Sequence, residues 1–245
     1  MTRTHRTVSF LTGLALSVGL SSLASAELAP GFDAALMSGD RPAEEKSRDA
    51  SRKPAEVLNF VGINEGMSVL EISAGAGWYS EVLSAAVGSE GHVIAQNSPR
   101  FEERVGDASR ARAERLGNVD VRFSEVGDLG LMNEVEAAFT ALNLHDAANR
   151  GDEVGMAFLG GIYTALEPGG VLGLIDHAGS AGNDNQALHR IEKARAIEMI
   201  ERAGFEVEAE SDILMNSADD HSLNIRDDSI RFQTDRFLIR ARKPE

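Results

Sequence analysis

Two patterns of apolar residues alternate along residues 57–245. Short apolar runs, typical of buried strands, are separated by stretches in which apolar residues recur every three or four positions, as on one face of a helix. The predicted strands are residues 69–72, 92–95, 119–123, 135–144, 171–176, 205–214 and 231–241. The predicted helices are residues 78–87, 99–116, 152–166 and 187–203. This order predicts one α/β domain with a doubly wound, mostly parallel seven-stranded sheet and helices on both faces.

The chain before residue 57 has a different character. Residues 1–26 combine a short basic start, a mostly apolar run and the small-residue pattern Ala24-Ser25-Ala26. This combination predicts a cleavable signal peptide and a periplasmic or secreted mature chain that begins near Glu27. The apolar run is shorter than the ~20 residues of a membrane-spanning helix, so no membrane anchor is expected. Residues 27–56 are predicted to form a lead-in followed by short helices.

Net charge and cysteine content exclude several kinds of binding partner and site. The formal net charge is −15, and removal of residues 1–26, which hold two arginines and no acid, makes it −17. So acidic a chain repels phosphate backbones, and no cluster of basic residues stands out in the sequence, so nucleic acid is not expected as a partner. The chain has no cysteine, which excludes disulfides, thiolate metal sites and a cysteine nucleophile. The sequence leaves the oligomeric state open.

A glycine-rich turn follows the strand at residues 69–72. The strand ends near Glu71, and Ser73, Gly75 and Gly77 then lead into the next helix. Glycine permits a ligand to approach the backbone closely, and the amides at a helix start face that ligand. A dinucleotide site would have a third glycine at the position of Ser80 and an acid at the end of the next strand. Because both are missing, a nicotinamide cofactor is disfavoured.

The turn and three later segments resemble the class I S-adenosylmethionine-dependent methyltransferases, which have a Rossmann-like fold. Glu71, Gly75 and Gly77 match the acid and two glycines of the first motif, and Ser73 replaces its first glycine. The other matching segments are the strand 119–125, the L-x-P-G-G turn at 166–171 and the helix-to-strand junction at 200–207. The resemblance implies S-adenosylmethionine as cofactor.

The same resemblance assigns expected contacts to the cofactor. Gly75 and Gly77 would lie under its methionine part and ribose, and Glu71 would order the loop or contact the amino group. Glu125 would lie near the adenine amino group. The family usually ends its second strand with an acid that takes the ribose hydroxyls, whereas this chain has Gln96 and Asn97 there, whose amides would take that place.

Several shorter segments resemble an exported bacterial group of predicted methyltransferases. These segments are residues 71–79, 176–177, 189–191, 218–221 and 234–237. The likeness supports the fold and the class of enzyme, and it supplies no substrate.

Polar residues follow the fourth and fifth predicted strands, at the sheet edge where ligands bind in open α/β folds. Asn143, His145 and Asp146 follow one strand, and Asp176 and His177 end the other. Histidine suits the role of a general base, so His145 and His177 are the candidates, with Asp146 or Asp176 as the partner that orients the ring. A cap at Asp176 is the alternative. Both histidines are expected to face one cavity with Gly75 and Gly77.

Other polar groups are given smaller roles. Since no histidines are closely spaced in the sequence, no metal site is predicted. His189 is expected on the surface of the helix 187–203 or in its packing. The polar stretch between the last two strands, which contains Asp219 and His221, is predicted as a solvated loop, with a lid as the alternative.

The function predicted from these observations is an S-adenosylmethionine-dependent methyltransferase that acts on a small or peptide-like acceptor. The cofactor is made in the cytoplasm, whereas the signal peptide directs the chain outward. An exported, non-catalytic binding protein for a nucleoside-like ligand is therefore the alternative.

Overall fold

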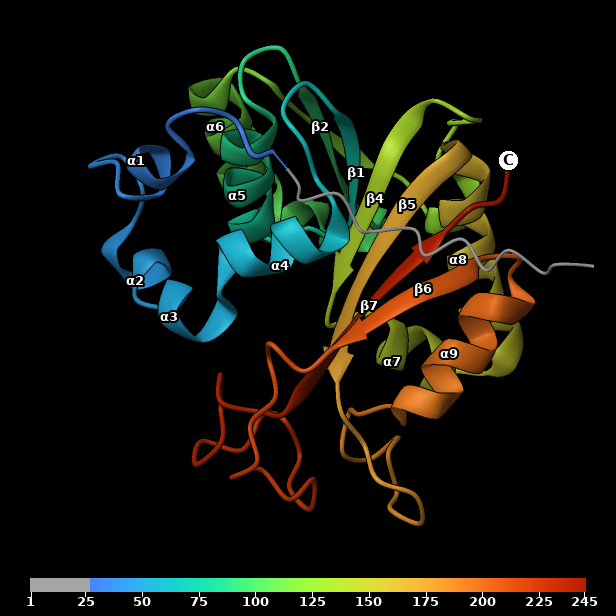
Figure 1. Cartoon of the computed structure of the whole chain (residues 1–245). Coiled ribbons are helices and arrows are strands. Elements are labelled where there is room, and N and C mark those ends of the chain that lie inside the picture. Colours follow the sequence, from blue (N-terminus) through green and yellow to red (C-terminus); the bar gives the residue numbers. More distant parts are fainter. Residues whose placement is uncertain (1–26) are drawn as a thin grey trace, which may run out of the picture.

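The computed structural model describes residues 27–245, and the predicted signal peptide lies outside this range. Seven strands form one sheet in the order β3-β2-β1-β4-β5-β7-β6 (Figure 1). Their bounds are β1 Ser68–Ile72, β2 His92–Asn97, β3 Val119–Phe123, β4 Val135–Ala141, β5 Leu166–His177, β6 Glu206–Ser211 and β7 Arg236–Arg242. Strands β1 to β5 pair in parallel, and β7 runs antiparallel between β5 and β6. The doubly wound, mostly parallel α/β fold is confirmed.

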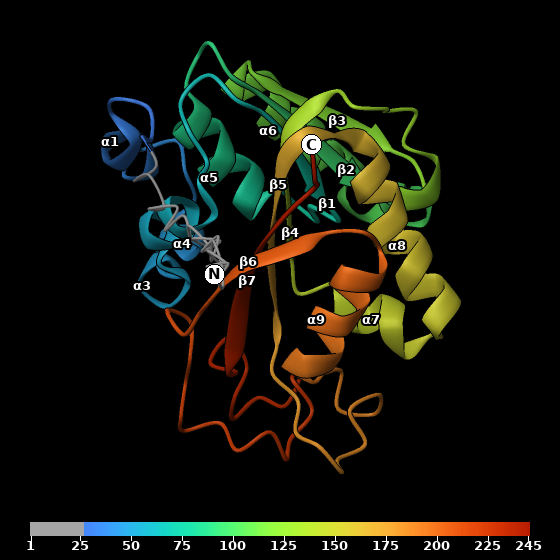
Figure 2. The ribbon, with the colours of Figure 1, turned by 45° about the vertical axis from the view of Figure 1, so that its right-hand side comes forward.

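Helices cover both faces of the sheet (Figures 1 and 2). Helices α4, α5 and α6 lie on one face, and α7, α8 and α9 lie on the other. Their bounds are α4 Pro54–Val61, α5 Trp78–Val87, α6 Glu102–Leu116, α7 Leu144–Asn149, α8 Asp152–Ala165 and α9 Lys193–Arg202. Two 3-10 turns, η1 Pro99–Phe101 and η2 Val126–Asp128, follow β2 and β3.

The core follows from the alternation of side chains along each strand. Leu70 and Ile72 of β1 pack in the cluster under α8 and α9, whereas Val69 packs in the cluster under α4 and α5. Successive strand residues point to opposite faces, so a strand covered on both faces is apolar almost throughout. Glu71 is the exception in this strand: it is a carboxyl group only 4% exposed, and it accepts a hydrogen bond from the Ser80 hydroxyl.

Three short helices precede the domain: α1 Phe32–Leu36, α2 Ala43–Lys46 and α3 Asp49–Arg52. Arg41, which is fully buried, holds them together through a bidentate ion pair with Asp49 (2.6 and 2.8 Å). The Trp78 indole of α5 donates to the carbonyl of Glu45 at 3.0 Å. These contacts fix α3 beside the carboxyl end of the sheet, at the edge where β1 and β4 end.

Several predicted bounds were wrong. Strand β5 begins at Leu166 rather than at residue 171, so it includes the predicted L-x-P-G-G turn, and β6 ends at Ser211 rather than at residue 214. Strand β4 stops at Ala141, and the next residues form the short helix α7, because Asp176 of β5 caps its first turn. Helix α9 begins only at Lys193, since Arg190 is fully buried and fixes residues 178–191 as an ordered loop. Strand β7 begins at Arg236 rather than at residue 231. Among the helices within residues 27–245, none combines the length and apolarity needed to span a bilayer.

Candidate functional site

The glycine-rich turn joins β1 to α5 in an unusual backbone conformation. Ser73, Gly75 and Gly77 all have positive φ, at 56°, 62° and 90°. A side chain at Gly75 would meet no atom within 4 Å, so its backbone borders open space. A side chain at Gly77 would instead lie 2.9 Å from the side chain of Arg112. The structure thus places Gly75 at a cavity and assigns Gly77 to the packing of α5.

Two amide side chains from β2 hold this turn in place. Gln96 accepts from the Ser73 amide at 3.0 Å and donates to the Ser124 carbonyl at 2.6 Å. Asn97 accepts from the Gly75 amide at 2.8 Å and donates to the Gly75 carbonyl at 3.1 Å. Because Gln96 has no exposed surface, it lacks the contact with ribose that the sequence suggested. Both amides hold the backbone of the turn in place.

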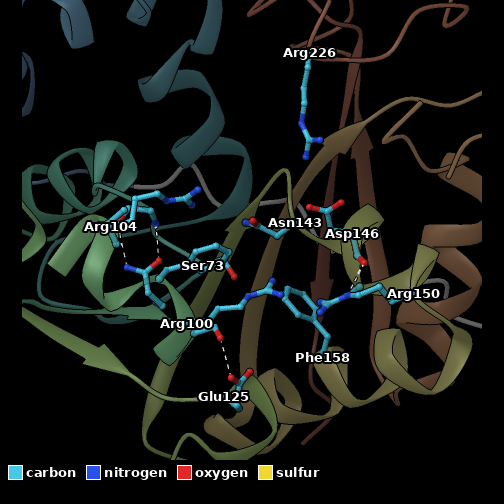
Figure 3. A pocket seen from close by; sticks show the side chains of 15 residues that line it. Ser73, Arg100, Arg104, Glu125, Asn143, Asp146, Arg150, Phe158 and Arg226 are labelled. Carbon is cyan, nitrogen blue, oxygen red and sulfur yellow. Dashed lines mark hydrogen bonds between the residues drawn. The ribbon is translucent and has the colours of Figure 1, made fainter. Parts of the chain in front are cut away.

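A cavity of about 680 Å³ opens over the turn (Figure 3). Ser73, Gly75, Asn97, Glu125, Asn143 and Asp146 line it, and all six were predicted from the sequence. We call it the turn cavity. Arg100, Arg104, Arg150, Phe158 and Arg226 also line it, and Figure 3 shows Arg226 entering from the late loop opposite Asn143 and Asp146. These arginines were not predicted.

The turn cavity continues into two others. A cavity of about 270 Å³ shares Ser73 with it and lies over Glu71, Trp78 and Tyr79. A third cavity, of about 430 Å³, shares Arg48, Arg52 and Leu142 with the second one and Arg226 with the turn cavity. The three cavities therefore share walls and form a row along the carboxyl ends of β1, β4 and β5, which we call the depression.

Five arginines surround the third cavity, which we call the arginine cavity. They are Arg48 and Arg52 from the N-terminal helices, and Arg226, Arg231 and Arg236 from the late loop and β7. Within residues 27–245 only Arg48 of the five forms an ion pair, with Glu44. Burial beside the neighbouring arginines lowers the pKa of Arg52, whose guanidinium stacks 4.4 Å from the Trp78 ring centroid. This basic cluster did not stand out in the sequence, because the fold assembles it from distant segments.

The late loop, residues 212–235, forms a wall of these cavities and is not merely solvated. Arg190 anchors it through a bidentate, fully buried ion pair with Asp219 (2.9 Å for both contacts) and through the carbonyls of Ala178 and Leu223. Asp235 also accepts from the ring of His221, at 2.9 Å. The loop thus has a defined position beside β5.

The four predicted catalytic residues lie together, though not around one cavity. Asp176 accepts from the His145 backbone amide at 2.8 Å and contacts the His145 ring nitrogen Nδ1 at 2.6 Å. The ring centroids of His145 and His177 are 5.5 Å apart. His145 is only 2% exposed and borders none of the three cavities, because α7 turns it inward. His177 lines the arginine cavity, and Asp146 lines the turn cavity.

The pKa values of the two histidines are shifted in opposite directions. Burial lowers the pKa of His177 to about 3, so its ring is neutral near pH 7. Burial also acts to lower the pKa of His145, but Asp176 outweighs it and the net pKa is raised. Burial alone would raise the pKa of Asp176, whereas contact with His145 lowers it below the usual range. Asp176 is therefore an ionised carboxylate that serves as both cap and ring partner.

Sequence reasoning missed the arginines because they come from segments far apart. One signal was available: Arg226, Arg231 and Arg236 recur every five residues in a chain with a large excess of acids. Nothing in the sequence showed that this stretch would lie against Arg48 and Arg52 of α3.

Comparisons with known proteins agree with this geometry. Over 91 residues the chain is 32% identical to the protein-L-isoaspartate O-methyltransferase of Thermotoga maritima, a match that covers 37% of this chain and 28% of that protein. The matched region thus spans less than a third of the relative's length.

Solved structures share the fold. A methyltransferase from Aquifex aeolicus has a TM-score of 0.60 at 24% identity, covering 83% of this chain and 98% of that one. The [4+2]-cyclase SpnF has a TM-score of 0.62 at 18% identity, covering 84% of both chains. The fold alone therefore admits more than one reaction.

The family is shown by a match over more than half of the chain. A family model matches residues 44–208, from α2 to β6. The matched range includes the glycine-rich turn, strand β2 and the cluster at Asp176. The chain therefore belongs to the protein-L-isoaspartate(D-aspartate) O-methyltransferase family, whose members are S-adenosylmethionine-dependent methyltransferases.

Proposed function

We propose that this protein transfers the methyl group of S-adenosylmethionine to a carboxylate of a small or peptide-like acceptor, with an isoaspartyl side chain as the first acceptor to test. The observation that carries the proposal is the arginine cavity, which adjoins the glycine-rich turn. The names of the family and of the Thermotoga relative point to the same acceptor group.

The turn cavity fits the cofactor. Its 680 Å³ lies in the range of sites for small ligands and cofactors. The open space at Gly75 lets a ligand approach the backbone, and Glu125 and Asn143 offer polar atoms at the cavity wall. When bound, S-adenosylmethionine supplies an electrophilic methyl group. The chain's own residues hold the turn rigid and shape the walls around it.

The arginine cavity fits an anionic acceptor. Guanidinium groups bind carboxylates through paired, charge-assisted hydrogen bonds. Arg52, Arg226 and Arg231 have no acidic partner within the described part of the chain, so they are available for such a ligand. A carboxylate bound there would lie beside the shared residue Leu142, next to the turn.

Methyl transfer to a carboxylate needs no general base, because the oxygen is already ionised near pH 7. The protein then has to orient the acceptor and exclude water. Neutral His177, held by Thr234 at 2.8 Å, is suited to positioning within the arginine cavity. This removes the need for the proton transfer that the sequence suggested for His145.

The test uses the mature chain, methyl-labelled S-adenosylmethionine and matched peptides that contain isoaspartate or aspartate. We expect labelled, base-labile methyl ester on the isoaspartyl peptide and at most a trace on the aspartyl peptide. Base-stable label would show that the acceptor atom is not a carboxylate oxygen and would contradict the proposal. Absence of labelling with isoaspartyl peptides and with free dicarboxylic acids alike, while cofactor still binds, would contradict the proposal.

We also propose that the protein acts outside the cytoplasm, as its likeness to an exported bacterial group and the signal pattern of residues 1–26 suggest. A fusion of residues 1–30 to a reporter active only in the periplasm should be active. The secreted product should begin at or near Glu27. A product that still begins at Met1 would contradict export.

A further inference from the structure

We propose that His145, Asp146 and His189 form a binding site for one divalent transition-metal ion, with zinc favoured by the ligand types. The site is independent of the proposed methyl acceptor. The sequence predicted no metal site because these ligands lie 43 residues apart, between α7 and the loop after β5.

The spacing of the three side chains suits a metal ion. The distance from His189 Nδ1 to Asp146 Oδ1 is 2.9 Å, and that from His145 Nε2 to the same oxygen is 3.4 Å. One ligand atom from each residue lies within 4.8 Å of the others. In a tetrahedral zinc site with bonds of about 2.0–2.2 Å, ligand atoms are about 3.3 Å apart. Small rotamer adjustments would close the site around an ion.

The surroundings of His145 direct one ring nitrogen toward the other two ligands. Asp176 contacts Nδ1 at 2.6 Å, and Nε2 on the other side of the ring faces the Asp146 carboxylate at 3.4 Å. Nε2 is therefore the ring atom placed to bind an ion together with Asp146 and His189. A carboxylate that orients a histidine from behind is also the usual support for a metal-binding imidazole.

The site combines a rigid anchor with access from outside. The His145 side chain is 3% exposed, whereas those of Asp146 and His189 are 52% and 26% exposed. His189 adopts a positive φ of 54°, a conformation with an energetic cost for a non-glycine residue. The loop thus holds its ring toward α7 against that cost. Because Asp146 also lines the turn cavity, a bound ion would lie at the edge of that cavity.

The test measures metal binding directly. The mature chain, without a histidine tag, is stripped with a chelator and titrated with Zn²⁺ by calorimetry, and Co²⁺ absorption reports the coordination. We expect one ion per chain, a tetrahedral Co²⁺ spectrum, and at least a tenfold loss of affinity in His189→Ala. The matched control is His92→Ala, because His92 also pairs with one carboxylate, Asp120 at 3.2 Å, but has no third ligand. It should bind as the wild type does.

Two outcomes would overturn the proposal. One is a stripped, folded protein that binds no ion at millimolar Zn²⁺ or Co²⁺. The other is equal Zn²⁺ affinity in the wild type and His189→Ala. Circular dichroism of the variant separates loss of the site from loss of the fold.

Discussion

The two ends of the depression are built in different ways. The floor of the turn cavity is formed by β1, β2 and the loop between β1 and α5, which follow one another within residues 68–97, whereas its other walls come from later segments. The arginine cavity joins residues 48–52 to residues 226–236, at opposite ends of the chain. The floor of the first cavity is encoded by a local motif, and the second cavity depends on the completed sheet. The motif that indicates the family therefore lies in the first, while the proposed acceptor site lies in the second.

The largest expected effect comes from a variant that removes the ion pair anchoring the late loop. Asp219→Asn would leave Arg190 buried without its anion, and breaking a buried ion pair costs about 3–5 kcal/mol. We expect a large fall in the free energy of unfolding, measured in urea. The control Asp152→Asn breaks an exposed pair with Arg202 and should cost less than about 1 kcal/mol. Equal effects would show that the loop is not anchored by Arg190.

A second test concerns the acid below the glycine-rich turn. Burial raises the pKa of Glu71 to about 7, whereas an unfolded glutamate titrates near 4.5. Between these values the folded state holds a proton that the unfolded state has lost, so stability falls as pH rises from 4.5 to 7. Glu71→Gln should therefore stabilise the protein at pH 8, by roughly 3 kcal/mol at most, and have little effect below pH 4.5.

The control for Glu71 has the opposite sign. Glu81 is also buried, but contacts with Arg115 and Arg112 lower its pKa despite that burial. Glu81→Gln should destabilise the protein at pH 8, and the difference should shrink as pH falls toward the acid range. Denaturation at a series of pH values measures both variants. Parallel pH profiles for the two would refute the assigned environments.

A third test concerns binding of the acceptor rather than of the cofactor. Arg226→Gln should raise the KM for an isoaspartyl peptide about thirtyfold, about 2 kcal/mol, because a charge-assisted contact is lost. Arg202→Gln removes the same charge from a residue that pairs with Asp152 and lines none of the three cavities, so it should leave the KM unchanged. If the two variants behave alike, the arginines act only through net charge.

The smallest expected effect lies in the locally encoded half. Gly75→Val places a side chain over the turn and should weaken binding of S-adenosylhomocysteine at least tenfold, about 1.4 kcal/mol. Gly66→Val is the matched control, because Gly66 also has positive φ (82°) and open space, at the opposite end of β1. Both variants carry the same backbone strain. Only Gly75→Val should affect calorimetric binding, and equal affinities would make the turn purely structural.

The sequence predicted the fold well because strand and helix periodicity are local properties. The glycine-rich turn, Glu125 and Asn143 line the turn cavity because they follow strands that the sequence pattern predicts locally. The inward turn of His145 was not predictable, since it depends on a contact with Asp176, which lies 31 residues later in the chain. The role of Arg190 was missed for the same reason. In the sequence it resembles any other charged residue, whereas in the structure it is fully buried.

Arg226 lines both the turn cavity and the arginine cavity. A side chain shared between two ligands couples their affinities, and thermodynamic linkage makes that coupling reciprocal. If the occupied turn cavity steers this guanidinium toward the acceptor, the acceptor must tighten cofactor binding by the same factor. One shared arginine would thereby link the filling of one cavity to the filling of the other.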